Sequence, residues 1–188
     1  ERNVGNIQEK LDEIRQMIQN PDFIAGRGLS NEVNIHILSY DPKDEMKIRH
    51  FVKQMHKDHT LKCNLIECNL YEKLLEICDA RHIVKAIPNM EKNKGKEYLK
   101  SQLNKVAGVD AFIKAIQYAP HGEKDVLLIT GIGSVFPFMR VHALLNAMQP
   151  HFSDVAILAL YPGEYDGRMV RLFGEMKANP YYRAFNLS

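Results

Sequence analysis

Two continuous apolar runs constrain the fold of this chain more than any other feature of its sequence. The first, DVLLITGIG, spans residues 125–133 and ends in glycines, and the second, VAILALY, spans residues 155–161 and precedes Pro-Gly. A strand that is apolar at every position is covered on both faces, which is typical of parallel sheets with helices on either side. The two runs therefore predict buried parallel strands.

Earlier segments extend this pattern into a repeated strand–helix order. Stretches of β-rich sequence at residues 33–40 and 61–68 each precede apolar residues at helical spacing. Asp41 and Pro42 mark the start of the first of these helices, as an N-cap and a first-turn proline. Strands that alternate with helices usually run parallel. The sequence thus predicts an α/β fold: a three-layer domain with a mainly parallel central sheet flanked by helices.

The remaining segments predict the other elements and the domain boundary. We expect residues 1–32 to form an amphipathic N-terminal helix and a connector, and residues 33–188 to form a single α/β domain. Residues 89–95 are polar and rich in lysine, which predicts a surface loop. Residues 99–116 predict a helix that is bent at a glycine, and residues 134–148 predict another.

Composition excludes several classes of protein. The chain has 188 residues, of which 45% are apolar, enough for the core of one domain. A net charge of +2 argues against a dedicated nucleic-acid protein. Cys63, Cys68 and Cys78 form no CxxC motif, so we expect reduced thiols in a cytoplasmic protein. No apolar run approaches the length of a membrane span, and we expect no membrane partner.

Candidate functional residues follow the predicted strands. In open parallel sheets, ligands bind beyond the carboxyl ends of the strands. Here the informative ends are SYDP at residues 39–42, TGIGS at residues 130–134 and YPGEYDGR at residues 161–168. If these strands are neighbours, the three loops share one edge of the sheet.

The TGIGS turn is a candidate anion-binding or phosphate-binding site. Gly131, Gly133 and Ser134 precede a predicted helix, where glycines expose backbone N–H groups to an anion. The lysine and hydroxyl of the phosphate loop are missing at the required spacing, and so is the last glycine of the dinucleotide motif. A simpler interpretation is a tight turn in which Ser134 caps the helix.

No complete catalytic set emerges from the sequence. Ser134, His142 and Asp166 make a triad on paper, but the GxSxG elbow is absent. His56 and His59 lack an accompanying HExxH motif. We therefore predict no catalytic residue, no metal site and no cofactor, and we expect that the protein is not an enzyme.

The closing region is a candidate partner surface, because tyrosine and arginine concentrate in the hot spots of protein interfaces. An alternative, compatible with the first, is that Tyr181, Tyr182, Ala184 and Phe185 form a final edge strand. The candidate surface residues are Tyr161, Tyr165, Asp166, Arg168, Arg171, Tyr181, Tyr182 and Arg183.

Several stretches resemble the BrxB family of bacteriophage-exclusion (BREX) defence islands. They are DVLLITGIGSVFPFMRVHALLNAM, VAILALYPGEYDGRMVRLFGEMKANPYYRAF, SYDPKDE and LIECNLYEKLLE. The resemblance implies a small accessory component of a multi-protein system that methylates host DNA and blocks replication of unmarked phage. It supplies no catalytic residues that could be assigned to positions of this chain, and it implies that the enzymes of the system are separate chains. It further implies an adaptor or partner of a larger BREX protein, with PglZ, a member of the alkaline-phosphatase superfamily, as the first choice.

Two other functions remain open from the sequence. The TGIGS turn suits a degenerate nucleotide-binding or phosphate-binding α/β domain. The second function is direct DNA binding. In this case Lys92, Lys94, Lys96 and Lys100 would add a phosphate-binding patch to the arginines of the closing loop. The nearly neutral total charge argues against DNA binding.

Overall fold

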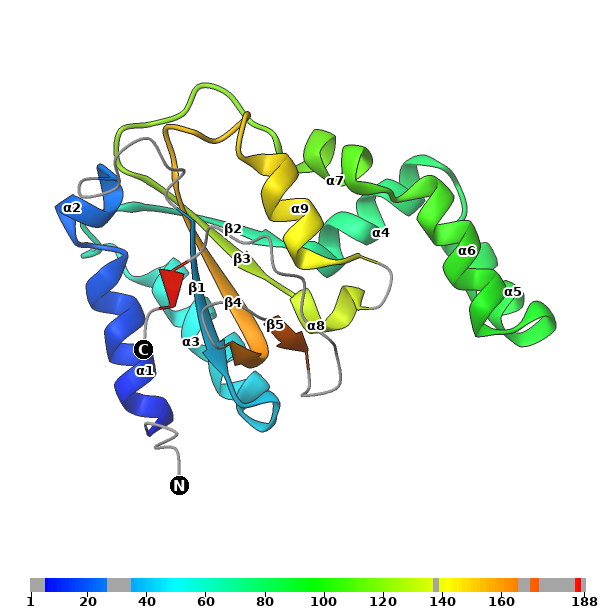
Figure 1. Ribbon diagram of the computed structural model, residues 1–188, viewed down its shortest axis with the longest axis horizontal. Helices are drawn as coiled ribbons and strands as arrows, with labels where there is room; N and C mark the ends of the chain where they lie inside the picture. Colours follow the sequence, from blue (N-terminus) through cyan, green and yellow to red (C-terminus); the bar gives the residue numbers. More distant parts are fainter. Residues whose placement is uncertain (1–5, 27–34, 137–138, 166–169, 173–184, 187–188) are drawn as a thin grey trace. The chain divides into compact units, whose positions relative to one another are not determined.

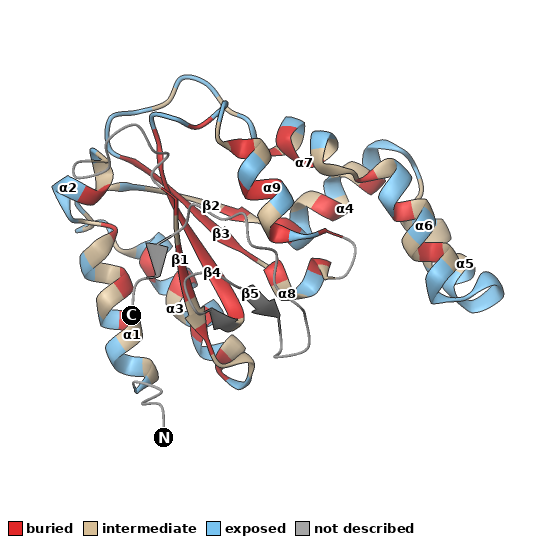
Figure 2. Ribbon diagram, in the orientation of Figure 1, coloured by how far each residue is buried: buried red, intermediate tan, exposed pale blue. Residues whose placement is uncertain are grey.

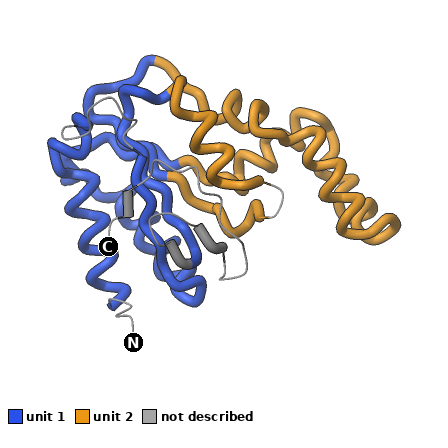
Figure 3. Tube along the Cα trace, in the orientation of Figure 1, with its two compact units in different colours: residues 1–67, 120–128, 152–188 blue, residues 68–119, 129–151 orange. Residues whose placement is uncertain are grey.

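The computed structural model describes residues 6–26, 35–136, 139–165, 170–172 and 185–186 (Figure 1). Residues 164, 165, 170–172 and 185–186 are described as backbone alone. The chain divides into two compact units, drawn in different colours in Figure 3. We call residues 1–67, 120–128 and 152–188 the sheet unit, and residues 68–119 and 129–151 the helical unit.

The strands of the described residues pair in the order β2-β3-β4-β1-β6, and β5 pairs with β4. β1 is parallel to β4 and to β6, whereas β5 is antiparallel to β4. The predicted α/β class, with a mainly parallel sheet flanked by helices, is confirmed. The strands are β1 Ile35–Tyr40, β2 Asn64–Asn69, β3 Asp125–Thr130, β4 Ala156–Tyr165, β5 Val170–Leu172 and β6 Phe185–Asn186.

Both faces of the central strands are buried (Figure 2). Alternate residues, among them Leu38, Leu128 and Leu158, join one apolar cluster with the inner faces of the helices of the sheet unit. Residues that point the other way, such as Ile37 and Leu127, are at most 1% exposed. Unbroken apolar sequence is therefore required in these strands, because neither face meets water. The helices of the sheet unit are α1 Ile7–Met17, α2 Pro21–Ile24, η1 Pro42–Asp44 and α3 Glu45–Lys57.

The helical unit contains the remaining helices, and in it α4 contacts α7 and α8 while α7 contacts α9. α5 and α6 lie side by side as a pair, which we call the α5–α6 hairpin (Figure 1). α5 has no buried residue, and α6 buries Leu99 and Leu103. The helices are α4 Leu70–Ala80, η2 Val84–Ala86, α5 Ile87–Lys94, α6 Lys96–Val106, α7 Val109–Ile116, α8 Ile132–Val135 and α9 Val141–Met148.

The prediction of a surface loop at residues 89–95 is wrong, because most of this stretch lies in α5. Pro88 sits in the first turn of this helix, and Gly95, with φ +83°, ends it. A helix that packs along one neighbour at the surface can be polar on most sides, so polarity alone did not distinguish it from a loop.

Two predicted helices are interrupted. The predicted helix at residues 99–116 is broken at Gly108, whose backbone is extended, with φ −72° and ψ 176°. The helix predicted at residues 134–148 is two helices, α8 and α9, and α8 begins before Ser134.

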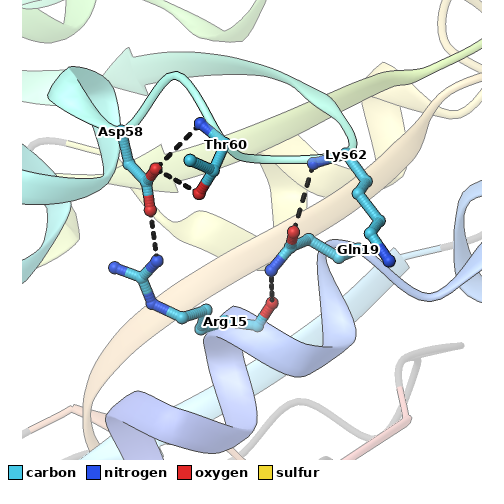
Figure 4. Close-up of polar contacts among 5 residues, drawn as sticks. All are labelled: Arg15, Gln19, Asp58, Thr60 and Lys62. Atoms are coloured by element: carbon cyan, nitrogen blue, oxygen red, sulfur yellow. Dashed lines mark hydrogen bonds and ion pairs between the residues drawn. The ribbon is translucent and has the colours of Figure 1, made fainter.

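The N-terminal helix was predicted correctly, and polar contacts fasten it to the connection between α3 and β2 (Figure 4). Arg15 donates to the Asp58 carboxylate, which also accepts from the Thr60 amide and hydroxyl at 2.9 and 2.6 Å. Gln19 donates to the Arg15 carbonyl oxygen at 3.0 Å and accepts from the Lys62 amide at 3.1 Å. The hydrogen bonds from Thr60, followed by those from Arg15, lower the pKa of Asp58 to about 2.

The predicted boundary after residue 32 is not where the two units divide, since residues 1–67 all belong to the sheet unit. The division into an N-terminal helix with a connector, residues 1–32, and a single α/β domain, residues 33–188, stays a prediction. Among the described residues, no helix combines the length and the apolar character needed to cross a membrane.

Candidate functional site

Two of the three predicted loops lie at the same edge of the sheet. Ser39 of β1 is in register with Tyr161 of β4, and Tyr40 is in register with Pro162. The strands are parallel, so the segments after Tyr40 and Pro162 both extend beyond the β1–β4 pairing at the same edge. We call residues 40–49 with residues 161–163 the β1–β4 edge. The TGIGS turn after β3 belongs to the helical unit, and its place at a common edge stays a prediction.

The chain after this edge forms a β-hairpin. β4 continues beyond its pairing with β1 and pairs with β5, which places Gly163 opposite Leu172, Glu164 opposite Arg171 and Tyr165 opposite Val170. The connection at residues 166–169 lies outside the described residues. The sequence did carry a signal for this hairpin, since Asp-Gly at residues 166–167 stands between stretches of strand-forming residues.

The predicted partner surface is only partly described. Tyr161 is 2% exposed and belongs to the interior of the sheet, where burial raises the pKa of its phenol. Its predicted place on an accessible surface is therefore wrong. Tyr165 and Arg171 lie on the two strands of the hairpin, at neighbouring register positions. The other predicted residues, Asp166, Arg168, Tyr181, Tyr182 and Arg183, lie outside the described residues.

The predicted final edge strand is partly described. β6 begins at Phe185 and stands beside β1 at the end of the strand order. The tyrosines at residues 181–182 lie outside the described residues, so their part in this strand stays a prediction.

Polar side chains at the β1–β4 edge are engaged with one another. The Tyr40 hydroxyl donates a short hydrogen bond to the Glu45 carboxylate, which accepts from Arg49 Nε at 2.8 Å. Burial, followed by the hydrogen bond to Glu45, raises the pKa of Tyr40. The Asp41 carboxylate accepts from the backbone amide of Lys43 at 3.0 Å, which lowers the pKa of Asp41. These contacts hold the start of α3 in place.

One apolar side chain at this edge has no cover. Met46, in the first turn of α3, is 72% exposed, and among the described residues it is one of two large hydrophobic side chains that are exposed. Helical spacing identified the buried face of α3, with Ile48, Val52 and Met55, but it gave no role to Met46. An unbranched thioether adapts to varied apolar surfaces, which suits a partner contact.

The glycine at the start of the TGIGS turn has a structural role. Gly131 has φ +72° and caps α8, so the prediction that Ser134 is the N-cap is wrong. A Cβ at Gly131 would collide with the Asn69 side chain and would lie 3.1 Å from the Tyr71 amide nitrogen. Asn69 caps α4 and accepts from the Tyr71 amide at 3.0 Å. Glycine therefore allows the turn to approach the start of α4.

The predicted chemistry of this turn stays untested. Gly133 is half-buried and Ser134 is exposed within α8, a helix of one turn. Anion binding by Gly131, Gly133 and Ser134 remains a prediction. His142 is half-buried on α9, and burial lowers its pKa. Among the described residues, no three His, Cys, Asp or Glu side chains gather as metal ligands.

Comparison with known proteins places this chain in a family. The family model for BREX protein BrxB matches residues 66–187. The BREX protein BrxB of Bacillus cereus (strain H3081.97) is 34% identical over 186 residues, which cover 96% of this chain and 97% of that protein. The BREX protein BrxB of Escherichia coli O9:H4 (strain HS) is 27% identical over 189 residues, covering 96% and 91%. No solved structure gives a significant match. The chain therefore belongs to the BrxB family, and this membership implies a role in BREX phage defence.

Proposed function

We propose that this protein is a non-catalytic accessory component of a BREX system, which acts in the cytoplasm by docking onto a larger BREX protein through the β1–β4 edge and the β4–β5 hairpin. The observation that carries the proposal is the exposure of Met46 at this edge, 72%, beside polar groups that already bind one another. Met46 gives this edge an apolar side chain that a partner can cover. The polar groups beside it are already hydrogen-bonded, which suits a docking surface better than a catalytic site.

The surroundings of Met46 suit a docking surface. Interfaces combine an apolar anchor with a polar rim that stays accessible to water. Lys43, Lys47 and Arg49 form such a rim, with side chains that are 75%, 62% and 58% exposed. Ion pairs with Asp41, Asp44 and Glu45 restrain the three cations, so less side-chain freedom is lost when a partner binds.

The β4–β5 hairpin extends the proposed docking surface, and it carries residue types that are common in interfaces. Its strands run past the last residue of β1 that pairs with β4. Tyr165 and Arg171 lie on these strands, and tyrosine and arginine are the residue types that dominate hot spots. Membership of the BrxB family makes other BREX proteins the expected partners, and the PglZ-like component of the alkaline-phosphatase superfamily is our first choice.

A binding experiment with purified proteins tests the proposal. The PglZ-like component of the same defence island is immobilised, and its affinity for the wild type is compared with that for Met46→Glu. Gln54→Glu is the matched control, because it adds the same charge at an exposed position of α3. We expect Met46→Glu to weaken binding by about 10-fold or more, since it places a charge in the apolar centre of the contact. Gln54→Glu should bind as the wild type does.

A second variant tests the β4–β5 hairpin, and both variants need a folding control. Tyr165→Ala/Arg171→Ala should also weaken binding about 10-fold or more, if these residues supply hot-spot contacts. Thermal unfolding of each variant checks that it remains folded. Folded variants that bind the PglZ-like component as tightly as Gln54→Glu does would show that this is the wrong surface. A wild-type protein that does not bind would show that PglZ is the wrong partner.

A further inference from the structure

The α5–α6 hairpin and the turn before it concentrate the positive charge of the chain. Residues 81–105 contain seven basic and two acidic residues, a net charge of +5, whereas the whole chain carries +2. The rest of the chain therefore carries −3, and the nearly neutral total conceals a segregated charge. The basic residues are Arg81, Lys85, Lys92, Lys94, Lys96, Lys100 and Lys105.

Most of the hairpin lysines are exposed to solvent, and the described part of the chain gives them no acidic partner. Four of them are exposed, and Lys100 is half-buried. No carboxylate of the described residues forms an ion pair with any of the five. Lys94 lies over the ring of Tyr98, with Nζ 4.6 Å from its centroid. Lys43 and Lys47 of the sheet unit differ, because each forms an ion pair with an aspartate. The charge of the hairpin is therefore available to an external anion.

One face of α6 has a shallow depression that suits phosphate oxygens. Lys100 and Lys105 line it together with Ser101, Asn104 and the carboxylate of Glu97. Ammonium groups, hydroxyls and side-chain amides are the groups that contact the DNA backbone in complexes. The hydroxyl and the amide can donate hydrogen bonds beside the two ammonium groups.

The hairpin fits a nucleic acid better than a protein. The cores of protein interfaces are poor in lysine and need apolar or aromatic anchors. Among the described residues, the large exposed hydrophobic side chains are Met46 and Tyr71, and neither is on the hairpin. A phosphate backbone needs no apolar anchor, because neutralising it releases condensed counterions.

We propose that the α5–α6 hairpin binds the phosphate backbone of double-stranded DNA without reading its sequence. The ammonium groups of the hairpin lysines contact the phosphates. The binding residues are Lys92, Lys94, Lys96, Lys100 and Lys105, a set that shares no member with the proposed docking surface.

The test measures the affinity of the full chain for a fluorescent DNA duplex by anisotropy, over a range of NaCl concentrations. We expect the wild-type affinity to fall steeply with salt, with a slope of about −4 in log K against log salt, because each contacted phosphate contributes roughly −0.9. Replacing the five hairpin lysines with glutamine should weaken binding by about 30-fold or more at low salt and remove most of the slope.

A matched control separates a local site from net charge. Lys53, Lys57, Lys62, Lys114 and Lys124 are exposed and lie outside the hairpin. Changing these five to glutamine removes the same charge and should weaken binding by no more than about 3-fold. Equal losses in the two variants would overturn the proposal, as would the absence of wild-type binding at low salt.

Two further measurements complete the test. One identifies the kind of anion that the hairpin binds, and the other shows whether DNA binding is independent of the proposed docking surface. Poly-glutamate should displace the duplex poorly, and displacement as effective as that by unlabelled DNA would indicate an acidic protein partner instead. Met46→Glu should bind DNA as the wild type does. A failure of docking and a failure of DNA binding therefore appear in different variants.

Discussion

The central strands of the sheet and the α5–α6 hairpin differ in how many of their residues are buried. All six residues of β3 are buried, whereas none of the eight residues of α5 is. Burial of apolar side chains provides most of the stability of a fold. The comparison teaches that the sheet holds the protein together, while the hairpin is free to carry charge. Four changes, from the largest expected effect to the smallest, can break or sharpen this contrast.

The largest effect is expected for Leu128→Ala in β3. Leu128 is 0% exposed and belongs to the apolar cluster of the sheet unit, so truncation leaves a cavity. We expect a loss of about 2–5 kcal/mol in the free energy of unfolding, measured by urea denaturation. Met90→Ala in α5, at a half-buried position, should cost less than about 1 kcal/mol. Equal losses would contradict the contrast.

A smaller effect is expected for Gly131→Ala. The positive φ of Gly131 strains any other residue, and a Cβ would collide with Asn69. We expect a loss of about 2 kcal/mol in the free energy of unfolding. Gly108→Ala is the matched change beside α6, where the Cβ would meet an ordinary contact at 3.6 Å. It should change stability by less than about 0.5 kcal/mol. Similar losses at the two glycines would show that neither the positive φ of Gly131 nor its approach to Asn69 sets it apart from a glycine in an ordinary conformation.

The third effect is a change in pH dependence. The folded protein holds the pKa of Asp58 at about 2, below its ordinary value near 3.9. Asp58 therefore stabilises the fold above about pH 4, and this contribution is lost as the pH falls from about 4 to 2. The free energy of unfolding of the wild type, measured by urea denaturation, should fall as the pH is lowered over this range. In Asp58→Asn it should depend less on pH. Parallel curves for the two proteins would mean that the contacts with Thr60 and Arg15 are not held in solution.

The smallest effect on stability is expected for the five lysine-to-glutamine changes in the hairpin. These side chains have no acidic partner among the described residues, so their loss removes no ion pair. The free energy of unfolding should change by less than about 0.5 kcal/mol, as measured by urea denaturation. A loss above about 1 kcal/mol would show that the lysines serve the fold.

Much of the sheet could be predicted from the sequence, because burial on both faces leaves an unbroken apolar run. The order β2-β3-β4-β1-β6 could not, since pairing depends on contacts between distant segments. The hairpin was harder for a different reason. Residues 89–95 are polar, and the same polarity fits a loop or a surface helix that packs on one neighbour.

The candidate site was only partly accessible to sequence reasoning. The joint exit of β1 and β4 followed from the parallel sheet and is confirmed by their register. Tyr161 was assigned to the surface because its residue type favours interfaces, but the buried part of β4 extends through it. Met46 was missed because helical spacing identifies the inner face of a helix and gives no weight to an apolar side chain outside it.

β1 stands between two strands that come from the last part of the chain. Its neighbours are β4, which begins at Ala156, and β6, which begins at Phe185. During synthesis the backbone N–H and C=O groups on both sides of β1 therefore stay unpaired until most of the protein has left the ribosome. Such distant pairing slows folding, and a waiting apolar strand can associate with other chains. Production at a lower rate of translation or temperature should thus favour the soluble protein over aggregates.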